Sequence, residues 1–171
     1  WIEIKAGYNH NCALDSSGAI ECWGIEDGGF YDRDHVTDTP TNDGYTTVSG
    51  GWVHNCALDS SGSIECWGID DGSSEDHGQV TDTPTSTGYT SVSAAAFHSC
   101  ALDSSGSIEC WGSDDYNQLT DTPTGSGYQE LTGFYRHTCA LDSSDSIECW
   151  GYDAYDQVAD TPTDSDYTTV R

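Results

Sequence analysis

Five short stretches of the chain each begin with an aromatic residue and end with a branched apolar one, with polar residues between them in most copies. They are residues 1–4, 45–48, 89–92, 128–131 and 167–170. Aromatic and β-branched residues with a period of two are typical of strands. The pattern therefore predicts five leading strands, all equivalent in position.

A second pattern, His-x-Cys-Ala-Leu-Asp-Ser-Ser-x-x-Ile-Glu-Cys-Trp-Gly, follows each of the first four stretches. Its copies are residues 10–24, 54–68, 98–112 and 137–151. Two apolar segments flank Asp-Ser-Ser, and these residues favour a tight turn. Gly18 and its counterparts suit a positive φ, and Asp145 holds that place in the last copy. Each copy is predicted to be a β-hairpin.

Pairing each hairpin about its turn puts the two cysteines of a copy opposite one another. Opposed residues in an antiparallel pair have Cβ atoms about 4.5–5.5 Å apart, which is close to the span of a disulfide. The predicted disulfides are Cys12–Cys22, Cys56–Cys66, Cys100–Cys110 and Cys139–Cys149. The alternative is a zinc site that uses His10, Cys12 and Cys22, but the chain has no Cys-x-x-Cys pair to support it.

The segment after each hairpin is acidic, then carries Val36, Val80, Leu119 or Val158, and ends in Asp-Thr-Pro-Thr. The apolar residue predicts a short fourth strand, and the proline predicts an exposed connector. No helical pattern occurs. We therefore expect an all-β single array of four blade repeats, each of four short antiparallel strands with one disulfide inside the hairpin. The expected bounds are about 1–44, 45–88, 89–127 and 128–166, followed by an extra strand at 167–171.

The net charge is −26, from 30 Asp and Glu against four Lys and Arg. Phosphate backbones and anionic membranes are poor partners for such a surface, so we expect neither nucleic-acid binding nor membrane insertion. Eight cysteines in regular pairs favour an oxidising environment. The expected location is extracellular or the cell surface.

The motifs Gly-x-x-His-x-Cys-Ala-Leu and Cys-Trp-Gly, followed by an acidic stretch with Gln-Val or Gln-Leu, resemble the regulator of chromosome condensation repeat. The resemblance is to the cysteine-containing version of secreted bacterial proteins, and it covers essentially the whole chain. It implies β-propeller blades of four antiparallel strands and a rigid platform whose loops bind macromolecules. The loops that serve nucleotide exchange in that family are not recognisable here.

Three kinds of candidate chemistry remain. The repeated His, Ser and Asp do not form a nucleophile elbow, and four equivalent triads would be unusual, so we expect no enzyme activity. Acidic turns make Ca²⁺ the candidate ion, and no other cofactor is expected. The calcium candidates are Asp70, Asp71, Asp114 and Asp115. Threonine beside proline is also typical of O-glycosylated segments. The candidates for modification are Thr39, Thr41, Thr83, Thr85, Thr122, Thr124, Thr161 and Thr163.

Four hairpins and five leading strands leave one strand without a hairpin. An unpaired strand edge is a template for another chain. Two interpretations follow: the chain is a segment of a longer array that continues at both ends, or the last strand completes a blade in the next copy. On the second, we expect a surface or fibre subunit in which copies join head to tail, and the residues expected to act in assembly are Trp1, Ile2, Ile4, Tyr167 and Val170. The alternative is a propeller that binds a basic protein or a glycan through its acidic loops, with residues 28–35 and 72–77 as the loops to test.

Overall fold

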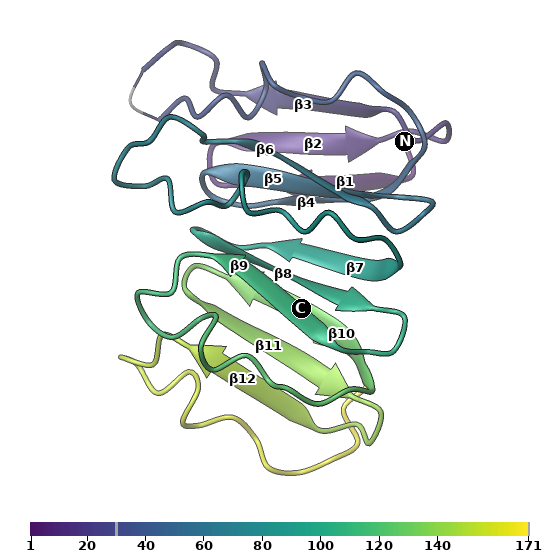
Figure 1. Ribbon diagram of the computed structural model, residues 1–171, viewed down its shortest axis with the longest axis vertical. Helices are drawn as coiled ribbons and strands as arrows, with labels where there is room; N and C mark the ends of the chain where they lie inside the picture. The colour runs from purple at the N-terminus through teal and green to yellow at the C-terminus, as the bar shows by residue number, and fades with distance from the viewer. Residues whose placement is uncertain (30, 171) are drawn as a thin grey trace.

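The computed structural model describes residues 1–29 and 31–170, and within them the chain is all β, with no helix. Twelve strands form four separate three-stranded antiparallel sheets, which we call blades 1 to 4 (Figure 1). Their bounds are Glu3–Ala6 (β1), His10–Leu14 (β2), Ile20–Gly24 (β3), Tyr45–Gly50 (β4), His54–Asp59 (β5), Ile64–Gly68 (β6), Tyr89–Ala94 (β7), His98–Asp103 (β8), Ile108–Gly112 (β9), Tyr128–Phe134 (β10), His137–Asp142 (β11) and Ile147–Gly151 (β12).

The hairpin register is the one that the sequence predicts. In blade 1, Cys12 lies opposite Cys22 and Leu14 lies opposite Ile20. The Asp15 carboxylate accepts hydrogen bonds from the amides of Ser17 and Ala19 at 2.8 and 3.0 Å, so this side chain closes the turn. The predicted positive φ is also present, at 83° for Gly18 and 62° for Asp145.

All four predicted disulfides are formed, with Cα–Cα distances of 4.0 to 4.1 Å. No described cysteine is free. The zinc alternative is wrong, because Cys12 and Cys22 are bonded to each other and carry no thiolate.

The predicted fourth strand is wrong: each blade has three strands. Val36, Val80, Leu119 and Val158 lie in turns. Local hydrogen bonds satisfy the backbone there, because Asp38 N donates to Asp34 O at 3.0 Å and Thr39 Oγ1 donates to Val36 O at 2.8 Å. Once these groups are used within the turn, they cannot form a ladder with a neighbouring strand.

The predicted fifth leading strand does not form a ladder either. Residues 167–170 have no strand assignment, and residue 171 lies outside the described residues. A leading strand pairs with the hairpin that follows it, and the described part of the chain has no hairpin after residue 170. The segment nevertheless keeps the place of a leading strand, as its contacts with blade 4 show below.

The blades stack in chain order, with blades 1 and 4 at opposite ends of the array (Figure 1). Among the described residues, four apolar clusters form the core, one between blades 1 and 2, two between blades 2 and 3 and one between blades 3 and 4. Among the described residues, no strand pairing joins blade 1 to blade 4. The array is therefore held by three repeated interfaces.

Candidate assembly interface

Each interface between blades joins two different surfaces. The cystine face is formed in blade 1 by Cys12, Leu14, Ile20 and Cys22 and by their counterparts in the other blades. The tryptophan face is formed in blade 2 by Tyr45, Val48, Ala57 and Trp67 and by their counterparts. The cystine face of one blade packs on the tryptophan face of the next, and this arrangement occurs three times.

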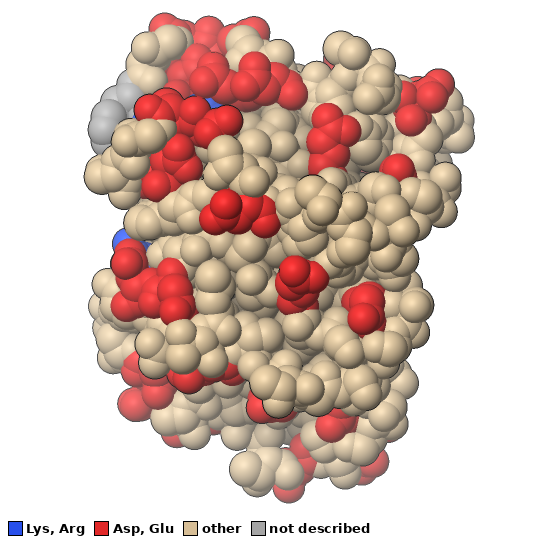
Figure 2. Space-filling model, viewed as in Figure 1, with Lys and Arg blue, Asp and Glu red and all other residues tan. Residues whose placement is uncertain are grey.

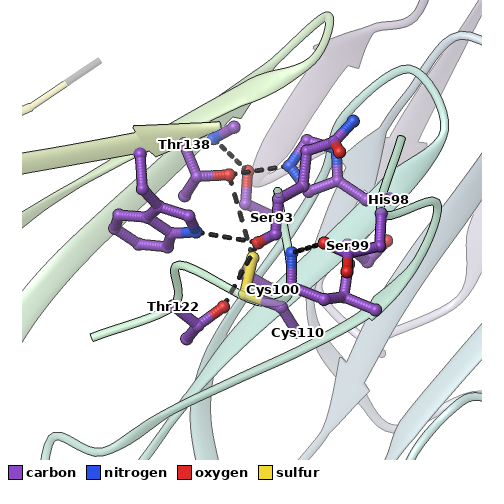
Figure 3. The surroundings of a disulfide bond; sticks show 12 residues. Ser93, His98, Ser99, Cys100, Cys110, Thr122 and Thr138 are labelled. Atoms are coloured by element: carbon purple, nitrogen blue, oxygen red, sulfur yellow. Dashed lines mark hydrogen bonds between the residues drawn. A yellow bond between two sulfur atoms is a disulfide. The ribbon is translucent and has the colours of Figure 1, made fainter. Parts of the chain in front are cut away.

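A buried histidine at the start of the second strand crosses each interface. His10 Nε2 lies 2.5 Å from Asn55 Oδ1, and His54 Nε2 lies 2.6 Å from Ser99 Oγ. Figure 3 shows the third contact, between His98 Nε2 and Thr138 Oγ1, beside the Cys100–Cys110 disulfide; its length is 2.8 Å. Burial lowers the pKa of His54 to about 3 and that of His98 to about 4, so these rings are neutral at pH 7. They have a structural role.

The tryptophan of each following blade holds the connector of the preceding repeat. Trp67 Nε1 donates to His35 O at 3.0 Å, Trp111 Nε1 to Gln79 O at 3.0 Å, and Trp150 Nε1 to Gln118 O at 2.9 Å. The connector is thus part of each interface, and its backbone conformation is fixed by the next blade.

The tyrosine that opens each leading strand makes two recurring hydrogen bonds. Its amide donates to the turn of the preceding hairpin, as Tyr45 N does to Gly18 O at 3.1 Å. Its hydroxyl donates to the glutamate of the motif in its own blade: Tyr45 to Glu65, Tyr89 to Glu109 and Tyr128 to Glu148. Burial, followed by this bond to a carboxylate, raises the pKa of Tyr45 and of Tyr128.

At one end of the array, the tryptophan face of blade 1 is uncovered. Trp23 is 44% exposed, whereas its counterpart Trp67 is 4% exposed. Ile4 is 66% exposed, whereas its counterpart Val48 is fully buried. Together with Trp1 and Ile2, these side chains border a hollow of about 450 Å³.

At the other end, residues 158–170 cover the cystine face of blade 4 only in part. Ile147 and Cys149 remain half-buried and border a hollow of about 280 Å³. The terminal segment lies where the next leading strand would lie, because Val170 N donates to Glu130 Oε2 at 3.0 Å. Val48 N donates to Glu3 Oε2 at the same distance in the first interface.

The predicted assembly residues thus lie at the two ends, with Trp1, Ile2 and Ile4 at one and Tyr167 and Val170 at the other. Sequence reasoning missed Asn11, Trp23, His137 and Gln157. The residues at the same positions of the other repeats make the buried contacts of the inner interfaces. Once one such contact is known, aligning the four repeats identifies the corresponding residues at the two ends.

The other candidate residues are more dispersed. No group of three or more His, Cys, Asp or Glu within residues 1–29 and 31–170 is placed to hold a metal ion. Asp114 instead accepts hydrogen bonds from the amides of Leu119 and Thr120 at 2.8 and 3.0 Å. Calcium binding by Asp70, Asp71, Asp114 and Asp115 stays a prediction.

The candidate threonines fall into two sets. Thr39, Thr83, Thr122 and Thr161 are half-buried, and their hydroxyls donate to backbone carbonyls of the preceding turn. Thr41, Thr85, Thr124 and Thr163 follow the prolines and are exposed.

Acidic side chains occur in patches along the whole array. Figure 2 shows Asp and Glu over the whole length of one face, with little Lys or Arg. The two loops proposed to bind a partner, residues 28–35 and 72–77, are joined by an ion pair between Arg33 and Glu75. No helix long and apolar enough to cross a membrane occurs among the described residues.

The sequence model of the regulator of chromosome condensation (RCC1) repeat matches residues 1–29 and 89–118. These are the beginning of the first and of the third repeat. No curated protein matches the chain in sequence.

Solved structures give the fold. The ectodomain of the receptor kinase CR4 from Physcomitrella patens is 26% identical to this chain, with a TM-score of 0.72. The aligned region covers 94% of this chain and 41% of the ectodomain chain. The CRINKLY WD40 ectodomain of the receptor kinase ACR4 from Arabidopsis thaliana is 25% identical with a TM-score of 0.70, at coverages of 86% and 49%. Prp20p from Saccharomyces cerevisiae is 18% identical with a TM-score of 0.63, at coverages of 88% and 41%. This chain spans less than half the length of each.

Proposed function

We propose that this chain, two segments of which match the RCC1 repeat, is a non-enzymatic structural subunit whose copies join head to tail through their end blades. One observation carries this proposal: each end of the array presents one half of an interface that the chain uses three times internally. A heterologous contact of this kind builds a filament when it does not close.

Tyr167 and Glu21 give the joint its direction. Among the described residues, Tyr167 is the one leading-strand tyrosine whose hydroxyl has no glutamate partner, and Glu21 is the one motif glutamate that accepts no tyrosine hydroxyl. Trp1 stands at the tyrosine position of blade 1 and has no hydroxyl. In the leading-strand position of blade 1, a tyrosine could donate to Glu21, whereas Trp1 cannot. Residues 167–170 of one copy therefore suit that position in the next copy better than residues 1–4 of the next copy do.

In this joint, the terminal segment pairs with β2 of the next copy and displaces that copy's residues 1–4. Trp23 of the next copy then donates to the backbone carbonyl of Gln157, as Trp67 does to His35. His137 meets the next copy's Asn11, as His10 meets Asn55. Each contact has three precedents within one chain.

The four disulfides and the similarity to two receptor ectodomains support a location outside the cell or at its surface. The net charge of −26 opposes contact between copies. We therefore expect assembly to strengthen from about 0.01 M to about 1 M salt, a range over which the Debye length falls from about 30 Å to about 3 Å.

The test uses two variants, each blocked at one end. Trp23→Asp places a charge on the open tryptophan face, and Val170→Asp places one on the terminal segment. Light scattering should give a large mass for the unmodified protein, a single-chain mass for either variant alone, and a dimer for their equimolar mixture. A single-chain mass for the unmodified protein at every salt concentration would overturn the proposal.

A third variant tests the strand exchange. Deleting residues 1–4 removes the competitor of residues 167–170, so assembly should strengthen. If the joint instead required an intact blade 1, the same deletion would weaken assembly.

The alternative function is a binding module for a basic protein. It is supported by the exposed carboxylates in Figure 2 and by the ion pair that joins loops 28–35 and 72–77. In that case the protein would stay a single chain and bind a basic partner with an affinity that falls as salt rises, which is the opposite salt dependence.

A further inference from the structure

Two adjoining hollows run along the leading strands and across all four blades. The first, of about 290 Å³, lies at the turns between the first and second strand of each blade. The second, of about 600 Å³, lies along the leading strands themselves. They share lining residues, among them Gly50, Ala94 and Gly133, so they form one groove.

The first hollow has aromatic walls and a floor of small residues. The ring of Trp52 lies 4.4 Å from that of Tyr8 and 5.6 Å from that of Tyr135, measured between centroids. The floor is formed by glycine and alanine from each blade, and a Cβ on Gly51 would lie 2.3 Å from Ala95 O. Small residues here keep the blades close together. The Tyr8 ring is 59% exposed, and the Trp52 ring behind it is half-buried.

The second hollow is lined with hydroxyl groups. Ser49 Oγ accepts a hydrogen bond from Ala94 N and Ser93 Oγ accepts one from Gly133 N, each at 2.9 Å. Each hydroxyl keeps its own proton to donate. Ser91 and Thr132 line the same hollow. The groove therefore offers several hydrogen-bond donors at fixed positions along the leading strands.

The charge of the groove differs from that of the rest of the protein. None of the described residues that line it is Asp or Glu, although the chain has 30 of them. The one charged lining residue is Lys5, which lies 3.1 Å from the carboxylate of Glu3. The nearest carboxylates, Glu3 and Glu130, already accept hydrogen bonds from Val48 and Val170. An anionic ligand would be repelled by the net charge.

We propose that this groove binds an uncharged oligosaccharide in extended form. The Tyr8 and Trp52 rings provide flat apolar surfaces for the apolar faces of sugar rings, and the hydroxyls of β4, β7 and β10 bond the sugar hydroxyls. Apolar and aromatic walls with a few placed polar groups are typical of ligand sites of this size. The site is distinct from the acidic loops.

The probes are cellohexaose and chitohexaose, two uncharged hexasaccharides, with a polygalacturonate of equal length as the anionic control. Isothermal titration calorimetry should detect saturable binding of at least one uncharged probe and none of the anionic one. Tyr8→Ala and Trp52→Ala should each weaken binding about fivefold to tenfold, which is the size expected for one aromatic contact. Tyr155→Ala removes an exposed ring outside the groove and should leave binding unchanged.

Tyr8→Ala removes an exposed side chain, so it keeps the test valid if Trp52→Ala does not fold. The proposal is overturned if neither uncharged probe binds, if the anionic control binds as well, or if binding is the same in Tyr8→Ala as in the unmodified protein. A proline-rich peptide that binds the groove in place of both sugars would also overturn it.

Discussion

His10 Nε2 lies 2.5 Å from Asn55 Oδ1 across the interface between blades 1 and 2, and the ring of His35 is stacked on His10 with centroids 4.2 Å apart. Burial is the main cause that lowers the pKa of His10. Burial, and then the proximity of His10, lowers the pKa of His35 to about 4. The first interface thus requires two neutral histidines in contact.

This contact predicts acid sensitivity. The folded state keeps His35 neutral between pH 6.5 and about 4, while the unfolded chain binds a proton in that range, so the free energy of unfolding falls as the pH falls. For His35 alone the loss is on the order of 3 kcal/mol between pH 7 and pH 4. In His35→Gln, the free energy of unfolding should fall by about 3 kcal/mol less between pH 7 and pH 4 than in the unmodified protein. Denaturant unfolding at a series of pH values measures this.

Gln79 holds the place of His35 in the next repeat and provides the reciprocal variant, since each offers its carbonyl to a tryptophan. Gln79→His should make the free energy of unfolding fall more steeply as the pH falls. Equal profiles for the unmodified protein and His35→Gln would show that this ring does not couple folding to pH.

The sequence is most informative where a local rule fixes the outcome. Asp15, Gly18 and the opposed cysteines determine the hairpin, its register and its disulfide, because turn chemistry and the period of two leave little choice. The fourth strand could not be read in this way. Val36 has an apolar side chain suited to a strand, but Thr39 and Asp38 satisfy the local backbone first.

The candidate interface shows the same division. The sequence indicates that both hairpin faces are apolar, which predicts that the blades pack against one another. It does not indicate which residues of different repeats meet, because contacts such as Trp67 with His35 span 32 residues. The groove along the leading strands was missed for this reason, since it is formed by four turns that are separate in sequence.

The disulfides should contribute unequally to stability. Each closes a loop of ten residues, for which the chain-entropy contribution is about 2–3 kcal/mol. Cys100 is 1% exposed between two blades, whereas Cys139 and Cys149 are half-buried at the end of the array. Replacing Cys100 and Cys110 by Ala should therefore destabilise the protein more than replacing Cys139 and Cys149, in chemical unfolding without reductant. Equal losses would contradict this ranking.

The hairpin turn should distinguish Gly106 from Asp145. Gly106 has a φ of 75°, and a Cβ there would lie 2.5 Å from Tyr128 O. Gly106→Ala should cost at least about 1–2 kcal/mol, since the left-handed conformation alone costs about that much. Asp145 already carries a Cβ at a φ of 62°, so Asp145→Ala should cost less than about 1 kcal/mol. Thermal unfolding would measure both, and an equal loss would contradict the steric explanation.

If the threonines are O-glycosylated, the two sets should differ. Thr41, Thr85, Thr124 and Thr163 are exposed, so their hydroxyls are accessible. Thr39 and its counterparts donate to backbone carbonyls and would lose that hydrogen bond on modification. Mass spectrometry of protein from its natural source should find hexose only on the first set. Hexose on Thr39, Thr83, Thr122 or Thr161 would contradict this assignment.

The proposed joint predicts an energetic coupling between Tyr167 and Glu21 that exists only between copies. Tyr167→Phe removes the donor and Glu21→Gln removes the charge of the acceptor, and each should weaken association by about 1.5–3 kcal/mol, the range for a hydrogen bond to a charged group. In a double-mutant cycle on the association constant, the double variant should lose little more than either single variant. Tyr155→Phe and Glu26→Gln make the same chemical changes at exposed residues outside the joint and serve as matched controls. Additive losses from Tyr167→Phe and Glu21→Gln would mean that the two residues do not meet, and the strand exchange would then be wrong even if the copies associate.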